Sequence, residues 1–542
     1  MKYFDRRLSM NLELCSKYLR SNRTRSLVIF ILALLTFAIA SRFIFASVAS
    51  NPGHADPSFY YDVAQNLVEG RGFQIDYIWN YLNRPDSITH SSLDYWTPLT
   101  SVVIALSMLA FGKSLFAALL PSILFGIALS IPCYYFAIDY TGSKFVAISS
   151  AALILFVPRL FECSLLCDSI TIYAFFASTS LLAMMKGSSK PHMYLISSAC
   201  AALAHLTRQD GILLLVTLVI VVFASRLGRR EKVTYACLAL GIYFLVIGPL
   251  LVEYWRAFHQ LIPPGKSKIL FLRDQEDLFT YSKQLTLDSY LKWGYGNSMR
   301  SKISMAVLNL IALVGILGSL LWVFIVAAAA VDLVYLPIKW WDWNLHLPYL
   351  LYGGMLFTLY SFGMPYIGGG AFWKSSLALT PFLLVLGTMA VMRFIPSKRI
   401  ALLVLFVIGI LFVGQSLLDT RTRISMNAQM GAQLISLKNT IVTEIQSANL
   451  RDEAIIMTRN PWEVFHTTKY RCVQIPNDSL DIVFEVAKRY KANFLLLPAP
   501  RQALEGIYDG TTVDSRFQFL AAINGPQGGS SLKLFRICHD EN

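Results

Sequence analysis

Acidic, histidine and aromatic side chains are concentrated in one polar stretch, residues 51–98, which directly follows the first long apolar run. Its candidate site residues are His54, Asp56, Tyr60, His90 and Asp94. Only 15% of the 542 residues are charged and 55% are hydrophobic, so this concentration beside an apolar run predicts a site rather than a linker. A carboxylate at a membrane surface can act as a general base on an acceptor hydroxyl. Asp56 is the first candidate for that role. A second role, compatible with the first, is the N-cap of a helix over Pro57–Glu69.

Charged residues near later apolar runs add further candidates, namely Glu162, Asp168, Arg208, Asp210, Arg256, His259 and Lys374. Arg208 could bind a lipid phosphate through two parallel hydrogen bonds, or it could pair locally with Asp210 and close a turn. Arg256 and His259 lie in a basic, aromatic loop over 253–300, which could attract an anionic donor or contact lipid headgroups. Lys374 could bind a phosphate or extend to the membrane surface.

Repeated apolar runs predict a polytopic α-helical membrane protein, because a membrane-spanning helix needs roughly 20 apolar residues. About 11 spans are expected within residues 26–418, with boundaries uncertain by a few residues. They are Ser26–Ala49, Leu115–Ile138, Phe145–Pro158, Ser169–Met185, Met193–Leu206, Gly211–Ser225, Val233–Val252, Ile303–Ala330, Leu347–Gly363, Leu377–Met392 and Ile400–Leu418. The mean hydropathy of +0.52 agrees with this class.

Basic residues predict the orientation of these spans, because they are enriched on the cytoplasmic side. They dominate residues 1–25, so we expect a cytoplasmic N-terminus and an outward-facing stretch 51–98. Leu99–Phe111 is too short for a full span, and we expect a half-embedded helix that returns to the outer surface. With that choice, the basic loops 139–144, 186–192, 226–232 and 393–399 and the segment around Lys339 are all cytoplasmic. The formal charge of +14 is explained by these loops, and no nucleic-acid-binding motif accompanies it.

Residues 419–542 differ in composition and predict a small extracytoplasmic α/β domain. The expected helices are 430–448 and 480–490, and the expected strands are 454–457, 493–497 and 532–538. Cys472 and Cys538 lie in this segment and could form a disulfide in an exported domain, although their spacing does not decide it. A bacterial inner membrane is the compartment that fits this arrangement best.

Three motifs resemble the GT-C superfamily of membrane glycosyltransferases, within its protein-mannosyltransferase and aminoarabinose-transferase-like branch (glycosyltransferase family 39-like). The first is an acid after the first span followed by Y-x-x-x-A-x-x-L-x-x-G-x-G-F from Tyr60, then Trp96-Thr97-Pro98-Leu99. The second is Leu206-Thr207-Arg208-Gln209-Asp210-Gly211, and the third is Cys167-Asp168-Ser169 before a span. Ser92–Trp96 departs from the Lys-Pro-Pro-Leu sequence of the aminoarabinose transferases, which leaves the acceptor open and makes His90 and Asp94 local substitutes.

The resemblance implies Asp56 as the catalytic base and Asp168 as a second acid near the donor phosphate or a metal, with Glu162 as its alternative. It implies inverting transfer, with a divalent metal ion an option for which Asp56, Asp168 and His90 are the candidate ligands. Sugar nucleotides are cytoplasmic, so an outward-facing transferase is expected to use a polyprenyl-phosphate sugar. The acceptor could be a glycan, a lipid or a protein. The alternatives are a transporter or flippase of lipid-linked saccharides and a membrane scaffold for cell-envelope assembly.

Overall fold

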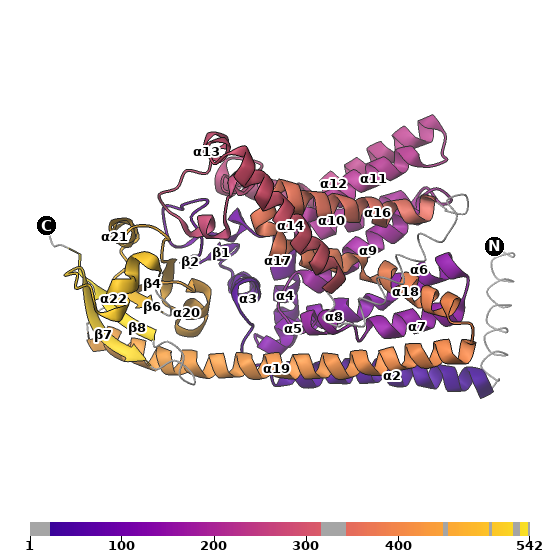
Figure 1. The fold of residues 1–542 in the computed structure, drawn as a ribbon, viewed down its shortest axis with the longest axis horizontal. Helices are drawn as coiled ribbons and strands as arrows, with labels where there is room; N and C mark the ends of the chain where they lie inside the picture. The colour runs from indigo at the N-terminus through magenta and orange to yellow at the C-terminus, as the bar shows by residue number, and fades with distance from the viewer. Residues whose placement is uncertain (1–21, 316–342, 448–453, 498–500, 524–531, 540–542) are drawn as a thin grey trace.

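The structure is a computed structural model that describes residues 22–315, 343–447, 454–497, 501–523 and 532–539. Three sequence-based predictions fall wholly or partly outside these residues. They concern the basic residues before Asn22, the part of the span Ile303–Ala330 beyond Gly315, and the cytoplasmic segment around Lys339. The chain is mostly helical, and its elements divide into a long helical bundle and a β-sheet at one end (Figure 1).

The helices of the bundle mostly follow the predicted apolar runs, although Pro365–Ser376 is helical where no span was expected. They are α2 (Asn22–Ser47), α4 (Leu99–Phe111), α5 (Leu115–Ala128), α6 (Ser130–Thr141), α7 (Lys144–Ile154), α9 (Ile170–Gly187), α10 (Met193–Thr207), α11 (Ile212–Ala224), α12 (Arg229–Phe258), α14 (Tyr295–Gly315), α16 (Trp343–Thr358), α17 (Pro365–Ser376), α18 (Thr380–Phe394) and α19 (Lys398–Ser447). Serine side chains cap some of them, as Ser114 does by accepting a 3.1 Å hydrogen bond from the amide of Ala117.

Five described helical segments are long and apolar enough to cross a membrane, and five shorter apolar helices accompany them. The long ones are Leu115–Thr141, Ile170–Gly187, Arg229–Phe258, Gly370–Arg393 and Arg399–Gln429. The most apolar window is 78% buried in Ile170–Gly187 and in Gly370–Arg393, but only 28% buried in Arg229–Phe258 and Arg399–Gln429. The first pair therefore forms the centre of the bundle, and the second pair presents apolar side chains to lipid. The chain is a multi-pass membrane protein, whereas the count of 11 spans stays a prediction.

The short helix α4 has the predicted bounds, and its surroundings agree with a helix that does not cross the membrane. Lys113, in the turn between α4 and α5, forms a 3.2 Å ion pair with Glu69 at the end of α3 (Ala55–Val68). This contact places the turn on the same side of the bundle as α3. At the opposite end, Lys186 of α9 pairs with Asp139 of α6 at 3.0 Å. The connections α6–α7, α11–α12 and α18–α19 also lie at that end, away from the sheet (Figure 1).

Outside the bundle, short elements surround α3 and carry the polar stretch 51–98. They are β1 (Gln74–Ile75), β2 (Tyr77–Ile78), β3 (His90–Ser91), η1 (Ser92–Asp94), α8 (Pro158–Cys163), η2 (Gln209–Gly211), η3 (Lys266–Phe271), η4 (Gln275–Phe279), α13 (Leu287–Lys292), the π-helical turn η6 (Leu359–Gly363) and η7 (Leu377–Leu379). β1 and β3 form a two-stranded antiparallel sheet. These elements lie near the start of α9 and the end of α17, where the acids of the candidate site are found.

The sheet at the end of the molecule has the order β2-β5-β4-β6-β8-β7. Its C-terminal elements are β4 (Ile455–Thr458), α20 (Pro461–Thr468), β5 (Arg471–Gln474), α21 (Leu480–Arg489), β6 (Phe494–Leu497), η8 (Gln502–Leu504), α22 (Glu505–Asp509), β7 (Phe517–Ile523) and β8 (Leu532–Ile537). Strand β2 belongs to the polar stretch after the first span and pairs in parallel with β5. The sheet is therefore built by two segments that are far apart in the sequence, and not by the C-terminal segment alone.

The predicted helix over 430–448 is present as far as Ser447, but it is not a separate element, because α19 continues into it from the last span without a break. Helix α19 runs along most of the molecule, lies beside α2 for part of this length and ends under the sheet (Figure 1). Cys472 and Cys538 are both free thiols. Cys472 belongs to β5 and Cys538 follows β8, and two strands of the sheet separate β5 from β8.

Candidate active site

Asp56 lies in the first turn of α3, immediately outside the membrane-spanning bundle. The prediction that it caps this helix is wrong, because α3 begins at Ala55 with His54 in the N-cap position. His54 makes no side-chain capping hydrogen bond, and its side chain is exposed. An acid in the first turn is stabilised by the helix dipole. The Asp56 carboxylate is 27% exposed and free of a capping contact, so it is available to another group.

Lys374 of α17 joins the two acids that the sequence singled out. Its Nζ donates to Oδ2 of Asp56 at 2.6 Å and to Oδ2 of Asp168 at 2.9 Å. The lysine side chain is only 16% exposed and that of Asp168 only 2%. Positions 56, 168 and 374 thus meet at one point, where an ammonium group bridges two carboxylates.

Asp168 lies in the turn between α8 and α9, and several partners stabilise its ionised carboxylate. Its second oxygen, Oδ1, accepts hydrogen bonds from the Ser169 amide at 2.6 Å and from the Ser169 hydroxyl at 3.0 Å. Burial alone raises the pKa of Asp168, but the charge and hydrogen bond of Lys374, followed by the charge of Arg208, bring it below its usual value. Asp168 is therefore a carboxylate at neutral pH.

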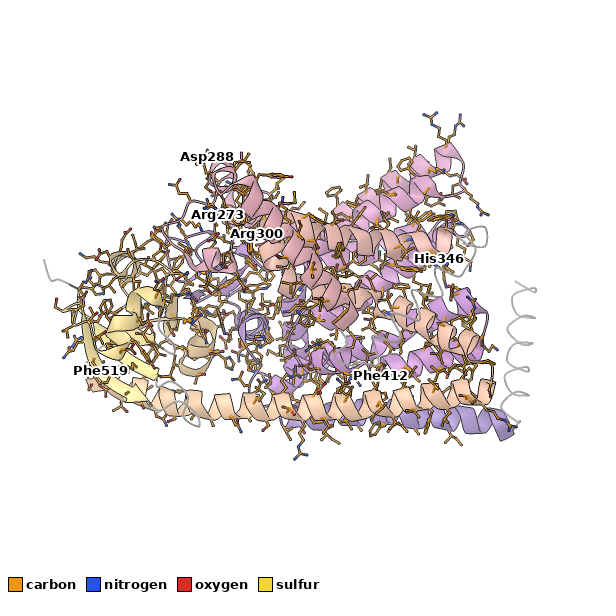
Figure 2. All side chains as sticks on the ribbon, in the orientation of Figure 1. Arg273, Asp288, Arg300, His346, Phe412 and Phe519 are labelled. Atoms are coloured by element: carbon orange, nitrogen blue, oxygen red, sulfur yellow. The ribbon has the colours of Figure 1, made fainter. Side chains whose placement is uncertain are left out.

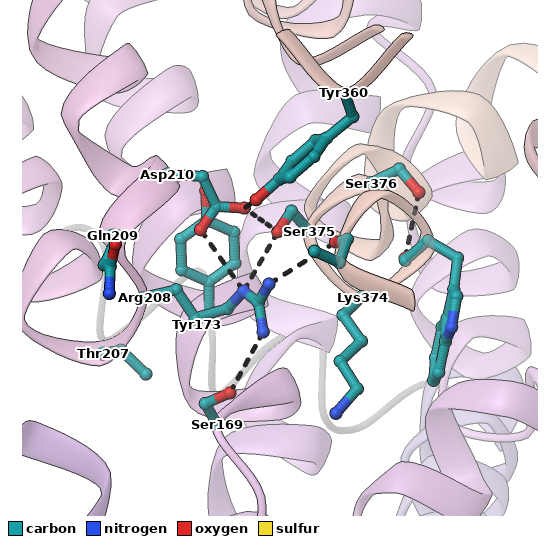
Figure 3. A network of polar contacts seen from close by, with 12 residues as sticks. Ser169, Tyr173, Thr207, Arg208, Gln209, Asp210, Tyr360, Lys374, Ser375 and Ser376 are labelled. Atoms are coloured by element: carbon teal, nitrogen blue, oxygen red, sulfur yellow. Dashed lines mark hydrogen bonds and ion pairs between the residues drawn. The ribbon is translucent and has the colours of Figure 1, made fainter. Parts of the chain in front are cut away.

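Arg208 and Asp210 form a second buried network next to the acids (Figure 3). Arg208 Nε lies 3.3 Å from Asp210 Oδ1 and donates to Ser375 Oγ at 3.0 Å. Its terminal nitrogens donate at 3.4 Å to Ser169 Oγ and to the Ala371 carbonyl. Burial lowers the pKa of Arg208, but Asp210 together with the nearby tyrosines Tyr360, Tyr60 and Tyr173 raises it by more, so the pKa lies well above its usual value. The predicted local pair is confirmed.

The same network positions Lys374, because Ser375 and Ala371 belong to the helix that carries the lysine. Ser375 also donates to Asp210, whose Oδ2 accepts from Tyr360 at 3.0 Å. Figure 3 shows Ser375 facing Arg208 while the Lys374 side chain extends to another side of α17. The turn itself requires glycine after Asp210, since a Cβ at Gly211 would lie 2.4 Å from the backbone nitrogen of His205.

We expect Arg208→Lys to lower the free energy of unfolding by about 1.5–3 kcal/mol, the usual contribution of a hydrogen bond to a charged group. An ammonium group cannot reproduce the planar set of contacts to Ser375, Ser169 and Asp210. Thermal unfolding of the purified protein in detergent measures the change. Arg256→Lys is the matched control, because Arg256 is 69% exposed and pairs only with the neighbouring Glu253 at 2.7 Å among its described contacts. Equal shifts for both variants would contradict the role given to Arg208.

Tyr60 also lies at the acids. It is 1% exposed, and burial raises its pKa well above the usual value, with Asp168 and Asp56 contributing in the same direction. Trp96 packs against Phe59 with ring centroids 4.1 Å apart and the rings tilted by 38°, and its ring centroid lies 6.3 Å from that of Tyr60. The first and third sequence motifs therefore meet in space around Asp56 and Asp168.

His90 and Asp94 form a separate pair and do not join the bridged acids. His90 Nε2 lies 3.5 Å from Asp94 Oδ2, and its Nδ1 donates to the Ile88 carbonyl at 2.7 Å. Burial lowers the pKa of His90, but the hydrogen bond and charge of Asp94, with smaller contributions from the Ile88 carbonyl and Asp76, together raise it by more, so the net pKa lies above its usual value. The proposed metal ligands Asp56, Asp168 and His90 are thus not brought together. Among the described residues, no three His, Cys, Asp or Glu side chains form a group that could hold a metal ion.

Three other candidates lie outside the cluster. Glu162 pairs with Arg159 at 2.8 Å and with Arg423 of α19 at 3.7 Å, which fastens α8 to α19. Arg256 and His259 are exposed at the end of α12. Of the two acids considered for the second position, the structure therefore places Asp168 beside Asp56, and Glu162 has a structural partner.

The contact between α3 and the C-terminal segment was not predicted from the sequence. Asp62 of α3 is 1% exposed and lies 3.2 Å from His466 Nδ1 and 3.7 Å from Lys469 Nζ. Both partners belong to α20 or its end, about 400 positions away, and no local spacing signals such a pair. Together with the pairing of β2 and β5, this contact fastens the helix of Asp56 to the C-terminal sheet.

We expect His466→Ala to lower the free energy of unfolding by about 1–3 kcal/mol, because a buried charged group loses a partner. Lys469 remains near Asp62 but is 53% exposed and compensates only in part. Amide hydrogen exchange should rise in α3 more than in α9 or α18. His192→Ala, at an exposed histidine before α10, should change neither quantity. Unchanged exchange in α3 would show that the sheet does not hold this helix.

Comparisons with known proteins agree with this fold. A model of the family described as dolichyl-phosphate-mannose-protein mannosyltransferase matches residues 96–255, which include Asp168, Arg208 and Asp210 but neither Asp56 nor Lys374. No curated protein matches the sequence.

Solved structures that resemble more than nine tenths of this chain include the following two. ArnT from Cupriavidus metallidurans, bound to undecaprenyl phosphate, has a TM-score of 0.59 at 12% identity over 94% of this chain and 98% of its own. The Archaeoglobus fulgidus oligosaccharyltransferase, in complex with Zn and sulfate, has a TM-score of 0.57 at 12% identity over 92% of this chain and 72% of its own. A sequence identity of 12% supports a similarity of fold alone. The family match and the shared fold confirm the resemblance of this chain to the GT-C, mannosyltransferase-like membrane glycosyltransferases.

Proposed function

We propose that this protein is a glycosyltransferase that moves a sugar from a polyprenyl-phosphate carrier to an acceptor on the outer face of the membrane. The observation that carries the proposal is the pair of carboxylates, Asp56 and Asp168, held by Lys374 at the end of the most buried helices of the bundle. The match to a mannosyltransferase family and the undecaprenyl phosphate bound to one protein of the same fold support a lipid-linked donor.

The transfer is a single displacement at the anomeric carbon. The acceptor oxygen forms the new bond to this carbon while the bond from the carbon to the phosphate oxygen breaks. Asp56 takes the proton of the acceptor hydroxyl, which is the step that a positioned general base accelerates. The electron pair of the broken bond stays on the polyprenyl phosphate. One displacement at this carbon inverts its configuration.

The remaining charged groups stabilise the leaving phosphate. An ammonium group has three donors, and two of those on Lys374 are used by the acids, so one is available to a phosphate oxygen. Arg208 adds a second positive charge nearby and holds α17 in place. Positive groups preorganised where negative charge develops are the largest catalytic contribution in many enzymes.

This function places the stretch 51–98 and the C-terminal sheet outside the cytoplasm, with the N-terminus inside, in a bacterial inner membrane. The supporting observation is that the basic loops 139–144 and 186–192 meet at the end of the bundle opposite α3. Access of impermeant thiol reagents to single cysteines introduced at exposed sites, such as Asp86 and Arg230, would test the orientation.

The function is tested by incubating purified protein with a panel of polyprenyl-phosphate sugars and measuring the free polyprenyl phosphate released. Release of carrier with one donor class, together with transfer to an added acceptor, supports the enzyme. A folded protein that releases no carrier from any donor would contradict it and favour a transporter of lipid-linked saccharides or a scaffold. Movement of intact donor across proteoliposome membranes separates those two.

A further inference from the structure

The position between the two site carboxylates is filled by a side chain of the protein itself. Carboxylate pairs that face a phosphate are a common setting for a divalent metal ion, and one protein of this fold is in complex with Zn. In this chain Oδ2 of Asp56 and Oδ2 of Asp168 both accept hydrogen bonds from Lys374 Nζ, at 2.6 and 2.9 Å. The ammonium group thus lies where a bridging cation would have to lie.

With Lys374 in place, the other groups at this point offer too few free oxygens and too much positive charge for a metal ion. Magnesium and related ions take about six oxygen ligands, whereas Asp168 Oδ1 is already occupied by the amide and hydroxyl of Ser169. No third acid or histidine joins the pair within the described parts of the chain. Arg208 is close enough to act on Asp168 electrostatically, so a dication would meet a second positive charge.

We propose that Lys374 replaces the divalent cation, and that sugar transfer by this protein is independent of divalent metal ions. The ammonium group performs the two tasks of a bridging ion: it bridges two adjacent carboxylates, offsetting one of their two negative charges, and offers a positive donor to the phosphate. Arg208 supports this by fastening α17 through Ser375 and Ala371. The inference deepens the proposed function at the same site.

Lys374 also prevents a metal ion from binding between the two carboxylates. If Lys374 is shortened to alanine, two carboxylates remain that were both within 3 Å of one atom. Two such carboxylates repel one another and bind a divalent cation readily. Lys374→Ala should therefore create a metal site that the wild-type protein lacks, and adding Asp168→Asn should remove it again.

The test measures Mn²⁺ binding by electron paramagnetic resonance to the purified full-length protein, independently of activity. We expect wild type to bind no Mn²⁺ through Asp56 and Asp168, Lys374→Ala to bind about one ion, and Lys374→Ala/Asp168→Asn to bind none. Lys292→Ala is the matched control, since it exposes Asp288, a surface acid whose side chain is 73% exposed. The inference is overturned if wild type binds one ion that Asp168→Asn abolishes, or if folded Lys374→Ala binds none.

Should Lys374→Ala not fold, the wild-type measurement still decides. Transfer by wild type in EDTA should stay within about twofold of transfer in Mn²⁺ or Mg²⁺, and loss of transfer in EDTA that either ion restores would overturn the inference. If wild type transfers no sugar under any condition, the proposed function fails, while the Mn²⁺ measurement still tests the role of Lys374.

Discussion

Asparagine at position 56 lowers the rate of sugar transfer by about 100- to 10,000-fold, the range usual for removal of a general base, and leaves the protein folded. The amide oxygen of asparagine can still accept the hydrogen bond that Lys374 Nζ gives to Asp56 Oδ2 at 2.6 Å. The geometry of the site is thereby kept, whereas the ability to take a proton from the acceptor is lost. Release of polyprenyl phosphate, measured for both proteins with the same donor, gives the ratio of rates.

The control for this prediction is Asp86→Asn in the same polar stretch. Asp86 is fully exposed and contacts Arg489 at 3.1 Å, away from α9 and α17. Its replacement should leave the rate unchanged. If Asp56→Asn and wild type released polyprenyl phosphate equally fast, Asp56 would not be the base, and Asp168 would be the remaining acid of the bridged pair.

Apolar runs predicted the helices well because the length and composition of a span are local properties. The bounds of α4 are those expected, and the expected span Met193–Leu206 is α10 (Met193–Thr207). The same reasoning failed at α19, where hydropathy drops after Leu418. A fall in hydropathy marks the membrane surface, but a helix ends only where its backbone is broken or capped. No proline occurs between Lys398 and Ser447.

The residues of the candidate site were predicted from the sequence, but the contacts between residues far apart in the sequence were not. Asp56, Asp168, Arg208 and Lys374 were each recognised as unusual, because charged groups near apolar runs are costly without a function. Their meeting was not predictable, since Asp56 and Lys374 are separated by 318 positions and no local spacing encodes their contact. Strand β2 was missed for the same reason, because its two residues become a strand only beside β5.

An ion pair at the periphery contributes less to stability than an ion pair at the site, as Lys292 and Lys374 illustrate. Lys292 pairs with Asp288 on α13, where both side chains are more than 70% exposed. Figure 2 shows Asp288 at the edge of the molecule. Lys374 and Asp168 are 16% and 2% exposed. Exposed ion pairs contribute little to stability because water screens them, whereas a buried charge that loses its partner destabilises strongly.

We therefore expect Lys374→Met to lower the free energy of unfolding by about 3–5 kcal/mol at neutral pH. A loss of this size is the usual result of breaking a buried ion pair. Asp168 keeps only its contacts to Ser169, and the repulsion between Asp168 and Asp56 is no longer compensated. Thermal unfolding in detergent measures the loss. Lys292→Met, which removes the same group from an exposed pair, should shift the unfolding temperature far less. Similar shifts for the two variants would mean that the bridge does not stabilise the fold.

The pH dependence of this loss distinguishes the bridge from simple packing. In wild type the pKa of Asp168 lies below its unfolded value, so its stabilising contribution is present above the unfolded pKa of about 3.9 and is lost as the pH falls below it. Without Lys374, burial is opposed only by Arg208 and Ser169, so the pKa of Asp168 rises relative to wild type, and the folded variant takes up a proton at a higher pH than the folded wild type does. The variant is therefore penalised at neutral pH and recovers as the pH falls toward about 4. Unfolding measured from pH 7.5 to 4.5 should show the gap to wild type narrowing, whereas a loss of packing alone would leave the gap constant.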